Sequence, residues 1–590
     1  MAGSQADEEL LRMLEEATSD AHRLQLETLR AILRRNAGCG YLRPHLVPLG
    51  GPTDGGAAAV DAESFRRLVP VSSYEDYADH IQRMADGTGD PSVLSFDRLI
   101  CFFYSSGTSS TRPKMVPYFD SQPAKVASGL AHQASFALLR RMMPPRPTIN
   151  KILWFIYAGN VTETRSGLKA MAASAYPFHS GGPNPPPSPV LSMCISPKQV
   201  ILGTDTQEQS YCHLLCGLSN RHVIDAIRAP YAAGLVRAIR LLESRWQQLC
   251  DDIEHGTVAA EVTDPAMRSA VQGLLGRPRP EEADRIRQIC GRARWGGILG
   301  ELWAEARYIA CVTTGTMEQY YHLLKHYAGS SLPVLCGDYF ASECAIGVNM
   351  ERNLPPGETS FVIVPTAAYF EFLPFEIGSA HSREDLVDIS GLQVGKMYEV
   401  VATTYRGLYR YRLGDVVRVV GFHNASPKVE FVTRAPKDYS DVFTEKDLVD
   451  AVESLQVLLR GDGSMGEIVE YASFLDSESK HVVIFLEMEK MWVPPDEVGD
   501  LAPLLKRACS FLEIGLGSVY KVKRKDGDLG PMEVVVVETG SFDELARTAV
   551  QNGAPANQYK PPKILRNSGF VELLKAHAVL SIRLPLDEEH

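Results

Sequence analysis

The sequence predicts a mixed α/β protein with a large N-terminal domain and a small C-terminal α+β domain, because its apolar pattern changes twice along the chain. Residues 221–310 repeat apolar side chains mostly at helical spacing. From 331 to 435 the period shifts toward two, and between 435 and 590 helical and strand patterns alternate. The β-rich runs of the second region are Leu332–Leu335, Ser360–Val364, Met397–Thr403, Val416–Val420 and Val429–Val432. We therefore expect two domains, residues 1–432 and 433–590, with a boundary near Phe431–Arg434.

The N-terminal pattern predicts an amphipathic helix. Apolar residues recur near helical spacing between residues 7 and 36, with charges between them, and Asn36 and Gly38 end the pattern. A helix of this kind either binds a partner or docks on its own protein. We expect the second.

Composition excludes several classes of protein. Among 590 residues, 45% are hydrophobic and 22% charged, and the net charge is −12. This balance is typical of a soluble globular protein and argues against one that coats nucleic acid or an anionic membrane. The acidic N-terminus has no signal-peptide pattern, and no apolar run reaches the ~18 residues of a membrane span. We expect a cytoplasmic protein that binds neither nucleic acid nor membrane.

The 11 cysteines are scattered and form no C-x-x-C pair, which fits a reducing compartment. Cys212, His213 and Cys216 lie close together, so a metal site is conceivable there. No further ligands are evident, and buried thiols on an apolar helix are the preferred interpretation.

The segment from Tyr104 to Lys114 is rich in hydroxyl side chains and follows an apolar run, Leu99–Phe103, that predicts a strand. Backbone amides and hydroxyls around Gly107, together with the charge of Lys114, suit a loop that holds phosphate oxygens. The glycines of a G-x-x-x-x-G-K-[ST] P-loop are missing. A surface turn rich in Ser and Thr is the alternative, which a buried strand directly before the loop disfavours.

A second polar segment, Gly337–Glu343, follows the apolar run Leu332–Leu335. Tyr339 and Phe340 can form a stacking surface for a flat ring, and Glu343 can hold a divalent cation. The alternative is that both rings pack in the core, as aromatic residues after a strand usually do.

Two further segments carry candidate polar groups. Tyr409–Val417 alternates and then reaches Gly414 and Asp415, which predicts a strand, a turn and a strand. An aspartate at such a turn can accept hydrogen bonds from both hydroxyls of a ribose, or it can simply cap the turn. Near the C-terminus, Lys560 lies beside prolines in a loop, where it can reach phosphate oxygens or remain in solvent.

Together these segments resemble the adenylate-forming superfamily, in which a phosphate loop, an aromatic and acidic nucleotide loop, a ribose aspartate, a hinge and a C-terminal lysine come in this order. Within it, the chain is similar to the plant acyl-acid amido synthetases of the Gretchen Hagen family. The similarity covers almost the whole chain, and Tyr369–Pro374 and Gly407–Val417 are its most specific runs. Residues 210–215 and 323–329 look closest to the jasmonate-conjugating branch.

The resemblance implies a firefly-luciferase-like fold and a reaction in two steps. An acid and ATP give an acyl-adenylate and pyrophosphate, and an amino acid then displaces AMP to give an amide. Glu343 would hold Mg²⁺, Asp415 would bind the ribose, and Lys560 would arrive with a mobile C-terminal domain, hinged near Arg434, to stabilise the transition state. The implied ATP site comprises Ser105, Ser106, Thr108, Ser109, Asp338, Tyr339, Phe340, Ala341, Ser342 and Asp415. The partners would be an acyl acid and an amino acid, and we expect a monomer.

The chain departs from the family pattern at three positions within these segments. Thr111 stands where many members have glycine, and Phe340 and Ala341 stand where Gly or Ala and then Ser are usual. The last two lie where nucleotide and acyl acid would meet.

By analogy, residues 125–139 and 157–176 line the acyl pocket. The candidates there are Lys125, Ser128, Gly167 and Ala172, each of which could equally serve core packing. Met171 occupies about the place where auxin-conjugating members tend to carry an arginine, so an apolar acid such as jasmonate is favoured. An auxin (indole-3-acetate) or benzoate/salicylate amido synthetase is the alternative. Two other interpretations remain. One is a protein with an adenylate-forming fold that binds nucleotide or hormone without turnover, and the other is an acid–thiol ligase that makes a coenzyme A ester.

Overall fold

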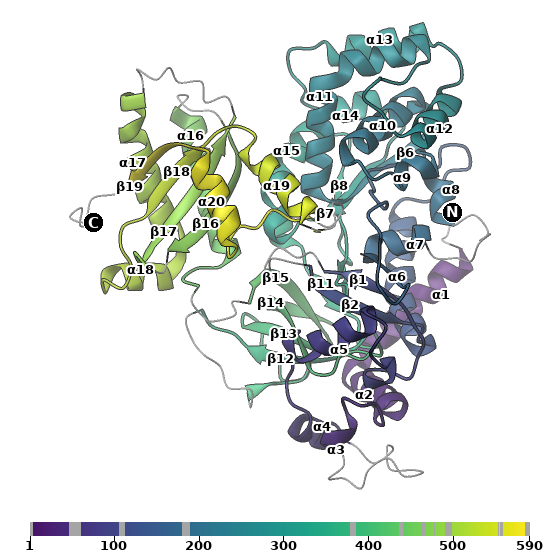
Figure 1. Cartoon of the computed structure of the whole chain (residues 1–590), viewed down its shortest axis with the longest axis vertical. Helices are drawn as coiled ribbons and strands as arrows, with labels where there is room; N and C mark the ends of the chain where they lie inside the picture. Colours follow the sequence, from purple (N-terminus) through teal and green to yellow (C-terminus); the bar gives the residue numbers. More distant parts are fainter. Residues whose placement is uncertain are drawn as a thin grey trace.

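The computed structural model in Figure 1 contains a sheet of four parallel strands at the centre of the large N-terminal part. In spatial order these strands are β3 (Lys151–Trp154), β6 (Ile224–Tyr231), β7 (Tyr308–Val312) and β8 (Val334–Cys336). The structure describes residues 4–583 except 47–60, 106–112, 180–188, 378–384, 436–440, 463–466, 477, 490–497, 553 and 555–558. Because parallel strands share one direction, the residues that follow all four strands lie along one edge of the sheet.

Helices cover this sheet and bury its apolar side chains. Leu153, Ile227 and Ile309 of the strands belong to one hydrophobic core with Leu214 and Leu242 of the helices. The helices are α9 (Lys198–Ile201), α10 (Thr206–Ser219), α11 (Ala232–His255), α12 (Pro265–Leu275), α13 (Pro280–Cys290), α14 (Ile298–Leu302) and α15 (Gln319–Ala328). The mostly helical pattern predicted for 221–310 is confirmed, with β6 and β7 as the exceptions inside it.

A sheet of seven antiparallel strands lies below the parallel sheet in Figure 1. In spatial order its strands are β12 (Tyr369–Pro374), β13 (Met397–Thr403), β14 (Tyr411–His423), β15 (Ser426–Arg434), β11 (Phe361–Ile363), β10 (Ala345–Val348) and β9 (Tyr339–Phe340). Each of the five predicted β-rich runs overlaps a strand, the first of them β8 and the others β11, β13, β14 and β15. The period-two pattern therefore predicts the positions of these five strands correctly.

The turn predicted at Gly414 and Asp415 is wrong, because β14 runs through both residues. The register against β13 shifts there, since Arg412 pairs with Val401 while Val416 pairs with Glu399. The extra residues form a bulge, which the left-handed backbone of Gly414 (φ 73°) permits. The Gly-Asp pair therefore forms a bulge in β14 rather than a turn, and Asp415 lies within the strand.

A small sheet joins the N-terminal segments to these two sheets. Its order is β2 (Met115–Phe119), β1 (Leu99–Tyr104), β5 (Lys169–Ala172) and β4 (Thr162–Glu163). β1 is almost wholly buried and pairs antiparallel with β2, so the segment between Tyr104 and Met115 joins two neighbouring strands. The predicted strand before the hydroxyl-rich segment is confirmed.

The N-terminal amphipathic pattern forms two helices rather than one. α1 (Gln5–Ser19) and α2 (Ala21–Asn36) are separated at Asp20, whose backbone is not helical. They dock on the main body as expected, since the buried Gln25 amide donates to the carbonyl oxygens of Pro365 and Ala368 at 2.5 and 2.6 Å. The other helices before α9 are α3 (Arg43–Leu46), α4 (Ala62–Leu68), α5 (Glu75–Ala85), α6 (Gln122–Met142), α7 (Tyr176–His179) and α8 (Pro189–Met193).

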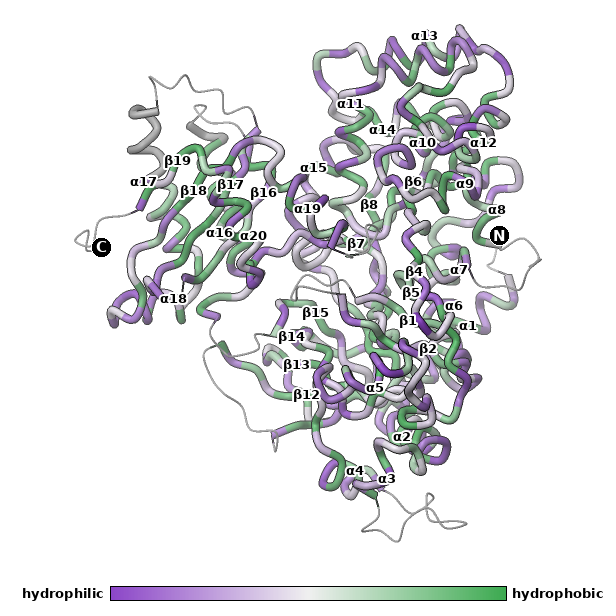
Figure 2. The backbone as a smooth tube through the Cα atoms, in the orientation of Figure 1, coloured by the Kyte–Doolittle hydropathy of each residue, from purple (hydrophilic) through white to green (hydrophobic). Residues whose placement is uncertain are grey.

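The C-terminal residues form a separate four-stranded sheet covered by helices, at the left of Figure 1. Its strands, in spatial order, are β16 (Ile468–Asp476), β17 (His481–Met488), β18 (Glu533–Val537) and β19 (Ala578–Arg583). Its helices are α16 (Glu445–Asp462), α17 (Val498–Gly515), α18 (Gly517–Lys525), α19 (Ser541–Gln551) and α20 (Ser568–Ala576). Figure 2 shows hydrophobic residues concentrated along β17 and β18, and this pattern explains why the sheet is buried between two helical layers. We call residues 441–583 the C-terminal unit.

A buried carboxylate joins the C-terminal unit to the large part. Glu470 of β16 accepts hydrogen bonds from the Tyr320 hydroxyl, from the Gln319 amide at 2.8 Å and from the ammonium of Lys563. Lys563 has no exposed surface, and its ammonium lies 4.0 Å from the centre of the Tyr471 ring. Since Gln319 and Tyr320 begin α15, this contact fixes the C-terminal unit against the end of the parallel sheet.

All 11 cysteines are free and buried, as expected. His213 uses both ring nitrogens inside the protein, with the Ser196 hydroxyl at 2.7 Å and the Ile156 carbonyl at 3.1 Å, so Cys212 and Cys216 belong to the core. Among the helices that the structure describes, none combines the length and apolar character that a membrane crossing requires.

Replacing Lys563 by methionine tests the buried contact. Lys563→Met leaves the Glu470 carboxylate buried without its cation, which we expect to destabilise the C-terminal unit by about 3–5 kcal/mol. The measurement is the urea midpoint of the C-terminal unit's transition in the full-length protein. Lys506→Met, at an exposed position of α17, is the matched control and should leave that midpoint unchanged. Equal midpoints for both variants would contradict the role of the pair.

Candidate active site

The hydroxyl-rich segment is anchored at both of its ends. The Ser105 amide donates to the Lys114 carbonyl at 2.9 Å, and the Lys114 amide donates to the Ser105 hydroxyl at 3.2 Å. The Lys114 ammonium lies 5.2 Å from the centre of the Tyr74 ring. Ser106, Thr108, Ser109 and Thr111 lie outside the described residues. β1 and β2 therefore bring Ser105 and Lys114 together at the base of the predicted phosphate loop.

The second segment is fixed by an internal ion pair. Asp338 accepts a hydrogen bond from Arg352 at 2.7 Å, one from the Ser135 hydroxyl at 2.5 Å and one from the Asn349 amide at 2.9 Å. Both partners of the Asp338–Arg352 pair are 8% exposed. Asp338 thus holds its loop against α6 and has its carboxylate engaged within the protein, although we predicted that it contacts the cofactor.

The aromatic residues of this segment are packed rather than open on both faces. The Tyr339 ring lies 5.5 Å from Phe361 and 6.4 Å from Phe431, and the Phe340 ring lies 4.3 Å from His132. Each ring is half-buried, so a flat ligand can reach at most one side of it. Burial raises the pKa of Tyr339 well above its usual value, so its hydroxyl keeps its proton.

Residues 341–343 connect this segment to the end of β1. The Ala341 amide donates to the Cys344 carbonyl at 3.0 Å and closes a tight turn between β9 and β10. The Ser342 hydroxyl donates to the Tyr104 carbonyl at 3.2 Å. Ser342 therefore holds the two candidate ligand loops side by side, and Glu343 follows it directly.

Asp415, in β14 of the antiparallel sheet, contacts this segment through Tyr339. The Tyr339 hydroxyl donates to one carboxylate oxygen of Asp415 at 2.7 Å, and Arg434 approaches the other at 2.6 Å. Asp415 and Arg434 face one another across β14 and β15 in the register of the sheet. The bulge at Gly414 and this pairing place a carboxylate and a guanidinium together beside Tyr339.

Glu343 shares this charged environment. Burial raises the pKa of Glu343, the positive charges of Arg434 and Lys114 oppose that rise, and the nearby Asp415 adds to it. Among the described residues, no group of three or more His, Cys, Asp or Glu side chains is arranged to hold a metal. A single carboxylate near phosphate oxygens nevertheless suits Mg²⁺, which usually takes one or two protein carboxylates together with substrate phosphates.

Lys560 reaches the same edge from the C-terminal unit. Its ammonium lies 4.7 Å from the centre of the ring of Tyr231, the last residue of β6. Burial raises the pKa of Glu445, and the positive charges of Arg434 and Lys560 both oppose that rise. Lys560 and Arg434 thus both lie close enough to Glu445 to favour its charged form.

The four candidates for the acyl pocket do not form a group. Ala172 is buried and pairs with Tyr104 at the site end of β5, whereas Gly167 lies beyond the opposite end of that strand. At ~3.3 Å per residue, Gly167 is roughly 15 Å away from the site end, so the structure does not support its prediction. Lys125 is exposed and pairs with Asp120, and the Ser128 hydroxyl donates within α6 to the Ala124 carbonyl at 2.6 Å.

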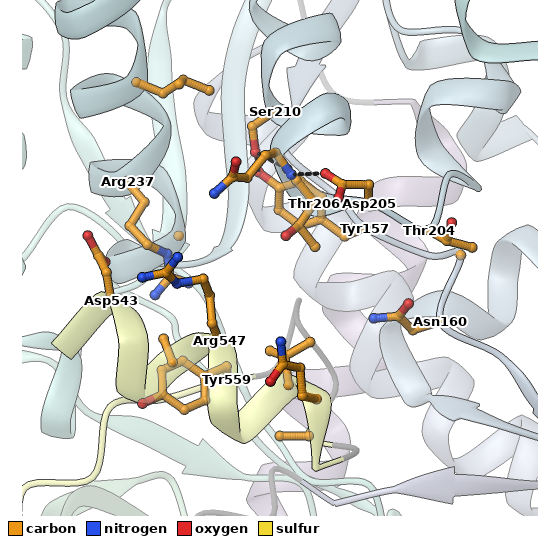
Figure 3. Close-up of a pocket in the computed structure, with 18 of the residues that line it drawn as sticks. Tyr157, Asn160, Thr204, Asp205, Thr206, Ser210, Arg237, Asp543, Arg547 and Tyr559 are labelled. Atoms are coloured by element: carbon orange, nitrogen blue, oxygen red, sulfur yellow. Dashed lines mark hydrogen bonds between the residues drawn. The ribbon is translucent and has the colours of Figure 1, made fainter. Parts of the chain in front are cut away.

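A cavity of about 1010 Å³ lies between the large part and the C-terminal unit (Figure 3). α10 and α11 form one wall, and α19 forms the other. Tyr104, directly before Ser105, and Tyr559, directly before Lys560, both line it. The sequence reasoning missed the charged residues of this cavity, Asp205, Arg237, Arg240, Asp543 and Arg547. It also treated Arg434 only as part of a hinge, because the pairing of Arg434 with Asp415 depends on the register of β14 and β15, which no local pattern gives.

Three consecutive segments match the domains of one protein family. Residues 10–334 match the GH3 family N-terminal domain, residues 361–434 its central domain and residues 446–569 its C-terminal domain. The chain belongs to the GH3 family. This assignment confirms the family resemblance described above, and the boundary predicted near Arg434 remains a prediction.

Individual relatives agree with the GH3 assignment. The chain is 52% identical, over 67% of its length and 82% of the relative's, to a probable indole-3-acetic acid-amido synthetase from Oryza sativa subsp. japonica. It is 34% identical, over 97% of its length and 98% of the relative's, to a jasmonoyl–L-amino acid synthetase from the same subspecies. A solved structure titled GH3.15 acyl acid amido synthetase superposes with a TM-score of 0.83 at 32% identity, covering 97% of each chain. The expected mixed α/β fold class is confirmed, and the chain shares its fold with this solved acyl acid amido synthetase.

Arg434 provides a test of the charge cluster in this GH3 protein. Without its charge, the pKa values of the Glu343 and Glu445 carboxyls should rise further. When folding raises the pKa of a carboxyl, the free energy of unfolding falls as the pH rises from the unfolded-state pKa to the folded-state pKa of that carboxyl, because the unfolded chain ionises more easily. We therefore expect Arg434→Met to reduce the free energy of unfolding already at about pH 5, where Asp415 loses its cation, and clearly more at about pH 7.5.

Urea titrations of both proteins at the two pH values measure this difference. Arg418→Met is the control, because Arg418 pairs on the same strands with Glu430, outside the cluster. A destabilisation by Arg434→Met that is the same at both pH values would show that these carboxyls do not depend on Arg434.

Proposed function

We propose that this GH3 protein is an acyl-acid amido synthetase that joins an amino acid to a hormone-type carboxylic acid through an acyl-adenylate. The family assignment confirms the expected enzyme class, an ATP-dependent acid–amino-acid ligase. The observation that supports the mechanism is a series of neighbouring charges: Lys114 and Arg434 both act on Glu343, Arg434 and Lys560 both act on Glu445, and Lys560 lies over Tyr231 at the end of β6.

The acyl substrate that we favour is indole-3-acetate. A relative 52% identical is named as an indole-3-acetic acid-amido synthetase, whereas the jasmonoyl–amino acid synthetase is 34% identical. These identities support the alternative stated above rather than the preference for jasmonate. Met171 is buried on β5 and pairs with Phe103, so it contributes to the core and its identity says little about the acid.

The first step brings an acid carboxylate onto the α-phosphate of ATP. A carboxylate oxygen forms a bond to phosphorus, and the bond to pyrophosphate breaks. Because both reactants are anions, positive charges held in place before the reaction lower the barrier. We assign this role to Lys114 and Lys560, and we assign Ser105 with the rest of its loop to the phosphate oxygens. Mg²⁺ at Glu343 would neutralise further phosphate charge.

Asp415 and its neighbours would bind the nucleoside. The Asp415 carboxylate is 5% exposed and is oriented by Tyr339 and Arg434. A carboxylate has about four acceptor positions, so two ribose hydroxyls can still be bound beside these two contacts. Tyr339 would orient Asp415 through its hydroxyl, while the ring edges of residues 339–342 would frame the adenine.

A panel of acids tests the proposed function. ATP-dependent release of pyrophosphate is measured with indole-3-acetate, jasmonate, benzoate and salicylate, and then amide formation is measured with an amino acid panel on the best acid. We expect release with indole-3-acetate and an amide product. Nucleotide binding without release for any acid would instead indicate a binding protein, and release followed by transfer only to coenzyme A would indicate an acid–thiol ligase.

Lys560 provides a sharper test of the first step. Lys560→Ala should slow acid-dependent pyrophosphate release by roughly a hundred- to a thousandfold, because a charge that faces the transition state is lost. The Kd of the acid should stay within about twofold, since ground-state binding does not need that charge. Lys525→Ala, at an exposed position of the C-terminal unit, is the control. A parallel loss of acid binding and release would refute the transition-state role.

A further inference from the structure

The cavity between the two parts is rich in arginine. Arg237 and Arg240 line it from α11, and Arg547 lines it from α19, against two acidic residues, Asp205 and Asp543. Figure 3 shows Arg237 and Arg547 extending toward one another from opposite walls. Among the described residues, neither of these two arginines forms an ion pair, and the Arg237 guanidinium lies 5.9 Å from the centre of the Tyr559 ring. Two guanidinium groups that face one another in this way favour an anion between them.

The acidic residues of the lining do not neutralise this pair. Asp205 caps α10, where its carboxylate accepts the amides of Gln207 and Glu208 at 2.8 and 2.9 Å. Asp543 is exposed and lies on α19, the helix that also carries Arg547. The cavity therefore keeps a net positive charge, although the whole chain carries −12.

The cavity also leads to the place where the acyl-adenylate would form. Tyr104 lines it and precedes Ser105 of the phosphate loop, and the Tyr104 carbonyl accepts from Ser342. Tyr559 lines it beside Arg237 and precedes Lys560. A small molecule anchored at the arginines thus has its other end directed toward the reacting groups.

We infer that this cavity is the amino-acid site, with Arg237 and Arg547 binding the substrate carboxylate from the two sides. This assignment rests on the proposed function, because it concerns its second step. An amino acid carries an anchor and a nucleophile on one carbon, so fixing the carboxylate also positions the amine. The amine lone pair then forms the carbon–nitrogen bond, the acyl carbon–oxygen bond breaks, AMP leaves with that electron pair, and the surplus proton on nitrogen passes to water.

The site requires both parts of the protein, because each supplies one arginine. Arg237 belongs to the large part and Arg547 to the C-terminal unit, which Glu470 holds against α15. The amino acid would thus bind only when the C-terminal unit is docked as in Figure 1. The carboxylate of the substrate would itself strengthen that docking, since it bridges two cations.

The test separates the two half-reactions. Acid-dependent exchange of pyrophosphate into ATP, without amino acid, reports the first step. Amide formation reports the second, with the L-amino acid of highest turnover and with its primary carboxamide, which keeps the amine but has no carboxylate. For Arg237→Met and Arg547→Met we expect exchange within about twofold of the parent and a KM for the amino acid raised at least roughly tenfold. The KM for the carboxamide should not change. Arg245→Met, on α11 outside the cavity, is the matched control.

The outcomes distinguish the inference from the proposed function. If the variants lose exchange while their KM for the amino acid stays unchanged, the cavity serves pyrophosphate and the inference is overturned. If the KM rises equally for the amino acid and its carboxamide, the arginines do not recognise the carboxylate and the inference is again overturned. If the parent protein shows no exchange with any acid, the proposed function itself fails.

Discussion

The contact at Glu470 is the interaction on which the candidate site depends. This buried carboxylate holds Lys563 of its own unit and Gln319 and Tyr320 of the large part at once. Because Lys563 follows Lys560 closely along the chain, the same contact that docks the C-terminal unit also brings Lys560 to the end of β6. A buried ion pair contributes little net stability compared with apolar packing, but it is specific, because any other docking would leave its charges unpaired. Its position between the two parts suggests that it selects one orientation of the unit.

Around this contact, the site is assembled from the ends of separate sheets. The parallel sheet supplies Tyr231 and the segment after β8, the small sheet supplies Ser105, and the antiparallel sheet supplies Asp415 and Arg434. Contacts between distant segments fix these groups: Ser342 contacts Tyr104 of the small sheet, and Asp415 contacts Tyr339 within the antiparallel sheet. A candidate site built in this way is cross-linked where we propose that the nucleotide binds, and a movement of the C-terminal unit would change only the contacts of that unit. That division suits an enzyme that must hold one intermediate while exchanging the next substrate.

Much of this arrangement could be predicted from local patterns, and the rest could not for physical reasons. Period-two runs located the strands from Ser360 to Val432, because burial on a pleated sheet imposes that spacing. The Gly-Asp signal was read as a turn, since turns and bulges use the same left-handed glycine and only the register of β13 separates them. The helix pattern near the N-terminus hid a break at Asp20, because both helices dock on one surface. Arg237 and Arg547 gave no signal, since each is an ordinary polar residue of an amphipathic helix until the two parts are docked.

The distribution of charge explains how bound substrates could favour the docked position of the C-terminal unit. The chain is acidic overall, yet Lys114, Arg434 and Lys560 lie at the edge where we propose that the nucleotide binds, and Arg237 and Arg547 line the cavity. Every proposed substrate brings an anion, as a phosphate or a carboxylate, whereas the amide product has lost one of the two carboxylates involved. Cations contributed by both parts repel one another when no ligand is between them, so a bound anion favours the docked form. On this argument, the substrates themselves supply part of the free energy that closes the C-terminal unit, and the loss of an anion as AMP leaves favours its opening.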